Sequence, residues 1–262
     1  MLKLYYFHGA TCGLKARLTL AEKDVEYTHE VVDRPYLRTP EYKKLNPNAV
    51  VPTLIHGPNV LIESSIIMNY VDDAFDGPEL KPDLPINRAQ MAMWLKNADE
   101  VYLPSLGTLT YTVSMRHKIL EKSEAERQEY LEGIPVMAAR ERRRLALELG
   151  FESPSFSPAL FELDRMLDDM ESALGQYEWL AGESYSLADA ALTPFVERLD
   201  ELNFTAMWED SRPAVTDWWD RIKTRESYDR VLGATPNPER PQHREKGSQA
   251  WPRIKEMLTR HR

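Results

Sequence analysis

The only cysteine of the chain, Cys12, lies where a predicted strand passes through a short loop into a predicted helix. The β-rich run at 4–7 favours the strand, and the small and polar residues at 8–11 favour the loop. A helical pattern begins at about Cys12 and carries apolar Leu14 and Leu18 on one face. Unpaired N–H groups and the positive end of a helix dipole favour an anion such as a thiolate. This junction is therefore the first place to expect chemistry.

Composition restricts the class of protein. With 262 residues, the chain is long enough for two domains and needs no disulfide bonds for stability. A single cysteine cannot form an internal disulfide, which indicates a reducing, cytoplasmic setting. We expect neither a signal peptide nor a membrane span, because no run approaches ~18 consecutive apolar residues. The formal charge of −9 argues against nucleic acid as a partner, and the basic run at 140–144 is expected to be a solvated helix face.

The first 76 residues are expected to form an α/β domain. Residues 25–32 alternate apolar and polar side chains, as a half-buried strand does, and complete a βαβ unit. The turn signal at 56–59, His-Gly-Pro-Asn, separates two apolar runs that favour adjacent antiparallel strands. The predicted elements are strands at 4–7, 25–32, 50–55 and 60–62, and helices at about 12–22, 40–45 and 66–75.

A second, all-helical domain is expected at 87–232, after a linker at 77–86 that contains three prolines and no periodicity. Ser186 followed by Asp189 resembles a capping box, and Tyr185 is placed to pack onto the apolar run that follows. The tail is assigned to 233–262. The predicted helical segments are 86–111, 159–174, 190–195, a helix opened by Pro213, and a short amphipathic stretch at 254–258 in the tail.

Several motifs, in this order and at these spacings, resemble those of the cytosolic glutathione S-transferases. They are Asn46-Pro47, Val-Pro-Thr-Leu at 51–54, Glu63-Ser64, Trp-Leu-Ala-Gly at 179–182 and Tyr-Ser-Leu-Ala-Asp at 185–189. The resemblance spans residues 2 to about 232. It implies a thioredoxin-like α/β domain that binds glutathione, an all-α domain that supplies the pocket for a second substrate, and usually a homodimer.

Within that family, the chain is most similar to two bacterial branches, through its loop at 11–15, its run at 49–54 and a long charged insert with Ile-Pro-Val at 134–136. The tetrachlorohydroquinone dehalogenases carry a cysteine at the position of Cys12. The glutathione-dependent β-etherases cleave lignin-derived aryl ethers; they share the insert but have Asn-Ser where this chain has Cys12-Gly13. The resemblance implies glutathione as co-substrate, no metal, and a hydrophobic aromatic electrophile.

Four residues are expected to hold glutathione. The hydroxyl of Ser64 and the N–H groups beside it can bind a carboxylate at a helix N-terminus, and the resemblance assigns Glu63 and Ser64 to the γ-glutamyl end. By resemblance Pro52 is a cis proline, which leaves the backbone of Val51 free to pair with the cysteinyl part. Val50 replaces a lysine that often meets the glycyl carboxylate. The candidates to substitute for that lysine are Arg38, Lys43 and Lys44.

The group that activates the glutathione thiol is left open among three residues. Lowering a thiol pKa by ~2 units from near 8.5 requires roughly 2.7 kcal/mol, whereas an exposed helix end supplies only ~0.3 to 1 kcal/mol. A direct hydrogen-bond donor is therefore needed. Thr11 can donate its hydroxyl, Cys12 can donate S–H or attack sulfur as a thiolate, and Tyr6 resembles the catalytic tyrosine of other transferase classes.

The second substrate is expected to meet an apolar and aromatic lining in the helical domain, formed by Tyr102, Leu106, Tyr111, Met115 and Phe195. We therefore expect a cytoplasmic glutathione transferase, with cleavage of a β-aryl ether and release of a phenol as the favoured reaction. The alternatives are reductive dehalogenation of chlorinated hydroquinones through Cys12, and a non-catalytic glutathione-binding or scaffold protein.

Overall fold

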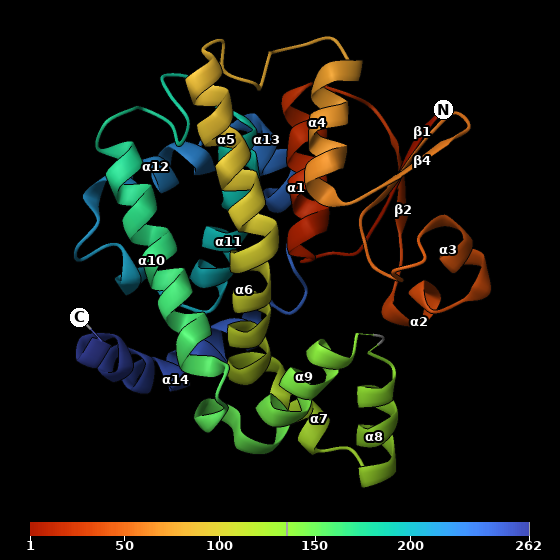
Figure 1. The fold of residues 1–262 in the computed structure, drawn as a ribbon, viewed down its shortest axis with the longest axis vertical. Helices are drawn as coiled ribbons and strands as arrows, with labels where there is room; N and C mark the ends of the chain where they lie inside the picture. The colour runs from red at the N-terminus through yellow and green to blue at the C-terminus, as the bar shows by residue number, and fades with distance from the viewer. Residues whose placement is uncertain (135, 262) are drawn as a thin grey trace.

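The computed structural model describes residues 1–134 and 136–261 and shows two domains packed side by side (Figure 1). A four-stranded sheet lies at one side of the molecule, and two helices, α1 (Thr11–Glu22) and α4 (Ser64–Ala74), stand between it and the helical domain. The expected combination of a thioredoxin-like α/β domain and an all-α domain is confirmed. The fully described stretch 75–84, which overlaps the predicted linker, contains neither helix nor strand.

The sheet has the strand order β2-β1-β3-β4. Its strands are β1 (Leu2–Tyr6), β2 (Thr28–Val31), β3 (Thr53–His56) and β4 (Asn59–Ile62). β1 pairs with β2 in parallel across the α1 crossover, whereas β1 with β3 and β3 with β4 are antiparallel. The predicted strand at 25–32 is shorter than expected, and three of its four residues are exposed, because β2 is an edge strand paired on one side only.

Two short helices, α2 (Arg34–Leu37) and α3 (Pro40–Leu45), carry the chain from β2 towards β3. After α3, the carbonyl of Val50 accepts hydrogen bonds from the Tyr42 hydroxyl at 2.6 Å and from the Asn46 amide at 2.8 Å. Tyr42 is completely buried, so this anchor is fixed to the core of the domain. Just after this anchor, the peptide bond between Val51 and Pro52 is cis, as the resemblance predicted.

The helices α1 and α4 run parallel. The ammonium of Lys15, near the start of α1, donates to the hydroxyl of Ser65 at the start of α4, at 2.8 Å. Lys23, at the end of α1, pairs with Asp72 near the end of α4 at 3.3 Å. Because the contacts advance along both helices together, the two N-termini lie next to each other at one end of the pair.

The helical domain begins with one continuous helical rod that extends the predicted helix at 86–111 to Leu120. It consists of α5 (Pro85–Asn97), the π-helical segment η1 (Ala98–Tyr102), α6 (Leu103–Thr110), the π-helical segment η2 (Tyr111–Met115) and α7 (Arg116–Leu120). The remaining elements are α8 (Glu124–Glu132), α9 (Met137–Leu149), η3 (Gly150–Glu152), α10 (Phe156–Leu174), α11 (Leu187–Glu201), η4 (Thr205–Met207), α12 (Pro213–Lys223), α13 (Glu226–Tyr228), the π-helical η5 (Asp229–Gly233) and α14 (Arg240–His261).

Helix α11 forms the centre of this domain and is buried over almost its whole length. The predicted capping box is confirmed at its start, where Ser186 and Asp189 exchange hydrogen bonds. The Asp189 carboxylate is fully buried and also accepts from the Leu180 N–H at 3.1 Å and the Trp218 indole at 2.9 Å. One acidic side chain thus joins three segments of the domain.

The charged insert forms α8 and α9, below α2 and α3 in Figure 1. The Arg38 guanidinium packs against Gly133, where an added Cβ would come within 2.7 Å of it. On α9, Arg144 of the basic run pairs with Glu141 and Glu148, as expected of a solvated helix face. Pro135 of the Ile-Pro-Val motif lies outside the described residues.

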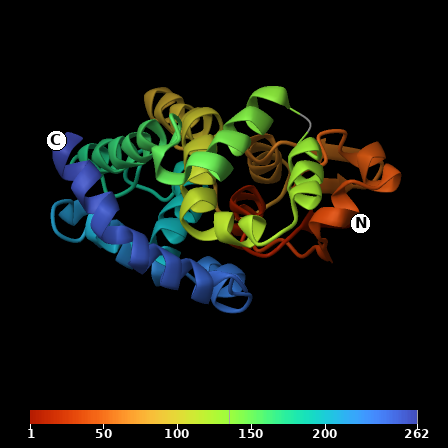
Figure 2. The ribbon, with the colours of Figure 1, turned by 90° about the horizontal axis from the view of Figure 1, so that it is seen from below.

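The tail differs from expectation. The sequence predicted only a short helical stretch at 254–258, whereas α14 extends from Arg240 to His261 along the flank of the helical domain (Figure 2). Pro241 is compatible with the first turn of a helix, where its missing N–H is not needed. The indole of Trp251 packs on the ring of Phe204 at 5.4 Å, so this part of the tail contacts its own domain.

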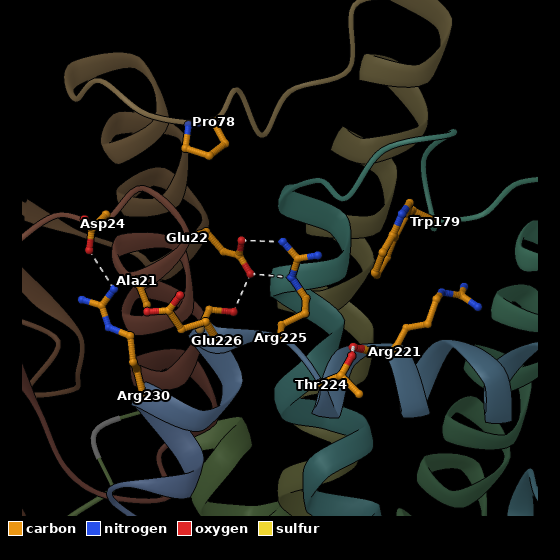
Figure 3. Close-up of a pocket in the computed structure, with 11 residues that line it drawn as sticks. Ala21, Glu22, Asp24, Pro78, Trp179, Arg221, Thr224, Arg225, Glu226 and Arg230 are labelled. Carbon is orange, nitrogen blue, oxygen red and sulfur yellow. Dashed lines mark hydrogen bonds and ion pairs between the residues drawn. The ribbon is translucent and has the colours of Figure 1, made fainter.

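A cavity of about 670 Å³ lies between the two domains near the C-terminal end of α1 (Figure 3). Glu22 crosses it and accepts two hydrogen bonds from the Arg225 guanidinium, each of 2.7 Å. Arg225 also lies over the ring of Tyr185 at 3.8 Å. At the rim, Arg230 pairs with Asp24 at 2.8 Å. Ion pairs therefore join the domains at this end of α1.

We expect Arg225→Ala to lower the free energy of unfolding by about 2 to 4 kcal/mol, because it leaves the nearly buried carboxylate of Glu22 without its cation. Arg230→Ala is the matched control: its partner Asp24 is 84% exposed, so the loss should stay below about 1 kcal/mol. Urea denaturation measures the free energy of unfolding of both variants. Equal losses would contradict the prediction that the Arg225–Glu22 pair stabilises the protein more than the Arg230–Asp24 pair.

Candidate functional site

The N-terminal ends of α1 and α4 meet at Cys12 and Ser64. Cys12 lies in the first turn of α1, and the hydroxyl of Ser64, the first residue of α4, acts to lower the pKa of its thiol. Ser64 itself is buried. Two sets of unpaired N–H groups and two positive helix ends therefore point to one place, which is favourable for an anion.

The surroundings of Cys12 keep its thiol protonated. Burial raises the pKa of the Cys12 thiol above its ordinary value, and the carboxylates of Asp99 and Glu63 raise it further. The ammonium of Lys15 and the hydroxyl of Ser64 act in the opposite direction without offsetting burial. In the absence of a ligand, Cys12 is therefore an S–H group at neutral pH rather than a nucleophilic thiolate.

Lys15 is the residue of this site that sequence reasoning missed. It is completely buried and donates to Ser65 and, at 2.6 Å, to the Asp99 carboxylate on η1 of the helical domain. A signal was present, because a residue three positions after Cys12 lies on the same face of a helix. Nothing in the sequence pattern pointed to Asp99, which comes from the other domain.

The other two predicted activators, Thr11 and Tyr6, differ in the hydrogen bonds that their hydroxyl groups make. Thr11 opens α1, and its hydroxyl makes no hydrogen bond to any residue that the structure describes. The Tyr6 side chain is 2% exposed, and its hydroxyl is hydrogen-bonded to Nδ1 of His29 at 2.9 Å. The guanidinium of Arg17 covers the Tyr6 ring at 4.4 Å. The Thr11 hydroxyl is free to donate, while the Tyr6 hydroxyl is already occupied.

Gly13 is closely packed against Tyr6. A Cβ added at Gly13 would lie 3.3 Å from the Cβ of Tyr6, which is tighter than most contacts of this kind. A serine at this position, as the β-etherase pattern has, would press on a ring that His29 and Arg17 already hold in place. The packing thus explains why glycine is suited to this position.

The four residues predicted to hold glutathione lie around the start of α4 and the cis peptide. Val51 is nearly buried beside Pro52. Glu63 is exposed and has a positive φ of 69°, an unfavourable conformation for a residue with a side chain, while the Asn48 amide contacts its carboxylate at 3.4 Å. Such strain is often found where a side chain is held for binding.

The three candidate partners of the glycyl carboxylate, Arg38, Lys43 and Lys44, are all exposed. None of them forms an ion pair with any residue in the described part of the chain. Lys43 and Lys44 lie at the end of α3, and Arg38 lies against the insert at Gly133. The choice among them stays open.

Comparison with known proteins identifies the family. The models of the Glutathione S-transferase N-terminal domain and the Glutathione S-transferase C-terminal domain match residues 1–73 and 152–226, together more than half of the chain. This chain belongs to the glutathione S-transferase family. Enzymes of the family use glutathione as a co-substrate.

Two relatives of this glutathione S-transferase family member, one of them also as a solved structure, match it over nearly its whole length. The Tetrachloro-P-hydroquinone reductive dehalogenase of Sphingobium chlorophenolicum is 28% identical over 87% of this chain and 94% of its own. Protein LigF of Sphingobium sp. strain SYK-6 is 28% identical over 86% of this chain and 90% of its own. The crystal structure of Beta-etherase LigF from that strain superposes with a TM-score of 0.78 at 26% identity, over 89% of this chain and 99% of that one.

The residues predicted to form the second pocket of this transferase fall into two groups. Tyr102, Leu106 and Phe195 are buried in the main core of the helical domain, with Tyr102 edge-on to Phe195, and burial raises the pKa of Tyr102 to about 12. Tyr111 and Met115 lie in a separate cluster with α8 and α9. Apolar periodicity marks both groups alike, because core and pocket use the same residue types.

Tyr111 is the unusual member of the second group. Its hydroxyl is buried and has no hydrogen-bond partner among the described residues, and burial raises its pKa. Its ring lies between Tyr130, with centroids 6.5 Å apart, and the Arg143 guanidinium at 3.9 Å. An unpaired buried donor under the insert is suited to a polar group of a ligand.

No helix in the described ranges is long and apolar enough to cross a membrane. Within residues 1–134 and 136–261, no three His, Cys, Asp or Glu side chains are grouped so as to hold a metal ion.

We expect Cys12 in the folded protein to react slowly with iodoacetamide at pH 7, and the rate to rise as pH increases through and beyond 9, because the raised pKa keeps the thiol protonated. The unfolded chain in urea is the reference, since Cys12 is the only cysteine and accounts for the whole signal. Mass spectrometry measures the rate. A folded rate above the unfolded rate at pH 7 would show an activated thiolate instead.

Proposed function

We propose that this protein is a glutathione transferase that acts on a hydrophobic aromatic electrophile. The observation that carries the proposal is the meeting of two helix N-termini at Cys12 and Ser64, beside the cis peptide before Pro52. This arrangement can hold both the carboxylate and the thiolate of one extended tripeptide. The likeness to LigF in sequence and in structure supports cleavage of a β-aryl ether as the favoured reaction.

The γ-glutamyl end and the cysteinyl part of glutathione each have a proposed partner. The γ-glutamyl carboxylate binds the Ser64 hydroxyl and the N–H groups at the start of α4, and the Glu63 carboxylate pairs with the α-ammonium. The backbone of Val51 pairs with the cysteinyl peptide as a neighbouring strand would. These contacts place the glutathione sulfur near the start of α1.

We assign activation of the glutathione thiol chiefly to Thr11. Its hydroxyl makes no hydrogen bond to a described residue, whereas the Tyr6 hydroxyl is bonded to His29 and the S–H group of Cys12 is a weaker donor than a hydroxyl. The thiolate, stabilised by this donor and the dipole of α1, attacks the carbon that bears the leaving group. A C–S bond forms, the C–O bond breaks with its electron pair, and the phenolate takes a proton from water.

Reductive dehalogenation is the second candidate, favoured by Cys12 and by the likeness to the Sphingobium chlorophenolicum dehalogenase. In this reaction the Cys12 thiolate attacks the sulfur of a glutathionyl-aromatic conjugate. A Cys–S–S–glutathione bond forms, the aromatic carbon leaves with the electron pair and takes a proton, and a second glutathione reduces the disulfide. The raised pKa of Cys12 is unfavourable for this step, so we place it second.

A homodimer and a cytoplasmic location stay predictions. Large apolar side chains on α4 and α5 are strongly exposed, and they favour a partner surface on that side. These are Ile66, Ile86 and Met93, with exposed fractions of 58%, 63% and 56%. A non-catalytic glutathione-binding protein is the remaining alternative.

Parallel incubation with glutathione and three electrophiles separates these functions. The electrophiles are a β-aryl ether, a chlorinated hydroquinone and an activated aryl halide, and chromatography measures the products. We expect phenol release from the ether together with a glutathione thioether. Glutathione binding by calorimetry without turnover of any of the three would instead support the non-catalytic alternative.

Variants at the start of α1 test the assignment of the activator. Thr11→Ala should lower kcat by about 10- to 100-fold and move its pH profile to higher pH, because one hydrogen bond to the thiolate is lost. Thr11→Ser keeps the hydroxyl and should stay within about threefold of the parent. Cys12→Ser should abolish only the reductive reaction. A larger effect of Cys12→Ala than of Thr11→Ala on ether cleavage would transfer the role to Cys12.

A further inference from the structure

The loop that leads into α1 is held from the helical domain. Gly9, two residues before Thr11, has a φ of +75°, and its carbonyl accepts a hydrogen bond of 2.5 Å from Nη2 of Arg198 on α11. The loop has one local backbone bond, from the Ala10 N–H to the carbonyl of Phe7 at 3.2 Å. The contact with Arg198 therefore adds a restraint that the loop does not supply itself.

The Arg198 guanidinium is fixed by two further partners. It is 9% exposed, and its Nε pairs with the Glu201 carboxylate, 2% exposed, at 3.1 Å. Its Nη1 donates to Nε2 of His243 on α14. A planar guanidinium with a different partner at each nitrogen cannot rotate without losing at least one of these bonds.

His243 acts in this arrangement as a neutral acceptor. It is completely buried, and because Nε2 accepts from Arg198, Nδ1 carries the proton and donates to the hydroxyl of Ser114 on η2. Burial and the charge of Arg198 lower the pKa of His243 to about 4. Of the other charged groups that face it, Lys118 lowers this pKa and Glu239 raises it. The imidazole is therefore uncharged at neutral pH.

Asn237 closes the other side of the loop. A Cβ added to Gly9 would lie 2.6 Å from both Cγ and Oδ1 of Asn237, so only glycine fits here. The Asn237 amide donates to the Glu201 carboxylate at 3.0 Å and is itself buried. Glu201 thus holds both Asn237 and Arg198 in place.

We infer that Arg198, Asn237 and His243, here called the loop brace, are positioning residues that set the orientation of Thr11 and Cys12. The tail is then part of the working site, although it contributes no group to the chemistry. The role of the loop brace in catalysis rests on the proposed function. The restraint on Cys12 is measurable without any turnover.

Alkylation of Cys12 by iodoacetamide reports the restraint directly. In the full-length chain, Arg198→Met should speed alkylation by about tenfold, because the loop and first turn of α1 open more often. Arg212→Met is the matched control, since Arg212 is also buried and pairs with Asp164 and Asp168 inside the helical domain, and none of its described hydrogen bonds or ion pairs reaches the loop. Its alkylation rate should equal that of the parent at the same folded fraction.

Two variants of His243 separate positioning from simple packing. His243→Gln offers an amide oxygen near the place of Nε2 and should keep the parent rate, whereas His243→Leu removes the acceptor and should behave like Arg198→Met. Both lose the imidazole, so only the hydrogen bond to Arg198 distinguishes them. If Arg198→Met does not fold, this pair decides the question.

With an activated aryl halide and glutathione, Arg198→Met and His243→Leu should lower kcat and leave the KM for glutathione within about twofold, since the γ-glutamyl partners are untouched. Rates of alkylation equal to the parent in both variants would overturn the loop brace. If the two variants are alkylated faster but the parent protein turns over none of the electrophiles, the loop brace is supported and the proposed function is overturned.

Discussion

A buried ammonium ion is the constraint on which the rest of the site depends. Lys15 is completely enclosed, and a charge in that position is stable only with its partners, Asp99 and Ser65. Asp99 comes from the helical domain and Ser65 from α4. The need to neutralise one charge therefore fixes the start of α1 against α4 and against the second domain together.

The same charge decides the electrostatics of the site. Without Lys15, burial and two nearby carboxylates would all disfavour a negative charge at the start of α1. With it, the site contains a buried cation, paired with the partly exposed Asp99, beside two helix N-termini. The balance leaves the protein's own thiol protonated. In the proposed function, the N–H groups and hydroxyls at the helix starts stabilise the thiolate of a bound ligand instead. This preorganisation separates the roles of donor and nucleophile.

What the sequence could predict was local or came from family motifs. The succession of strands and helices along the α/β unit, the capping box at Ser186 and the cis bond before Pro52 follow from turn residues, caps and resemblance. The ion pair of Lys15 with Asp99 and the bond from Arg198 to Gly9 join residues 84 and 189 positions apart, and no periodic pattern encodes such distances. Tyr102 and Phe195 show the other limit, because apolar stripes do not distinguish a core from a pocket.

The position of the activating donor follows from packing in the first turn of α1. The ring of Tyr6 is held by Arg17 and His29, and the Cβ of Tyr6 would lie 3.3 Å from a Cβ added at Gly13, which is a tight contact. A side chain at that position, as in the β-etherase pattern, would require a small shift of Tyr6 in the first strand. The residues in the first turn of a helix all point their N–H groups towards the same anion. A hydroxyl or thiol one or two residues before Gly13 can therefore bind the same ligand. Thr11 and Cys12 occupy those places. In the proposed function, one of these two side chains completes the anion site at the start of α1.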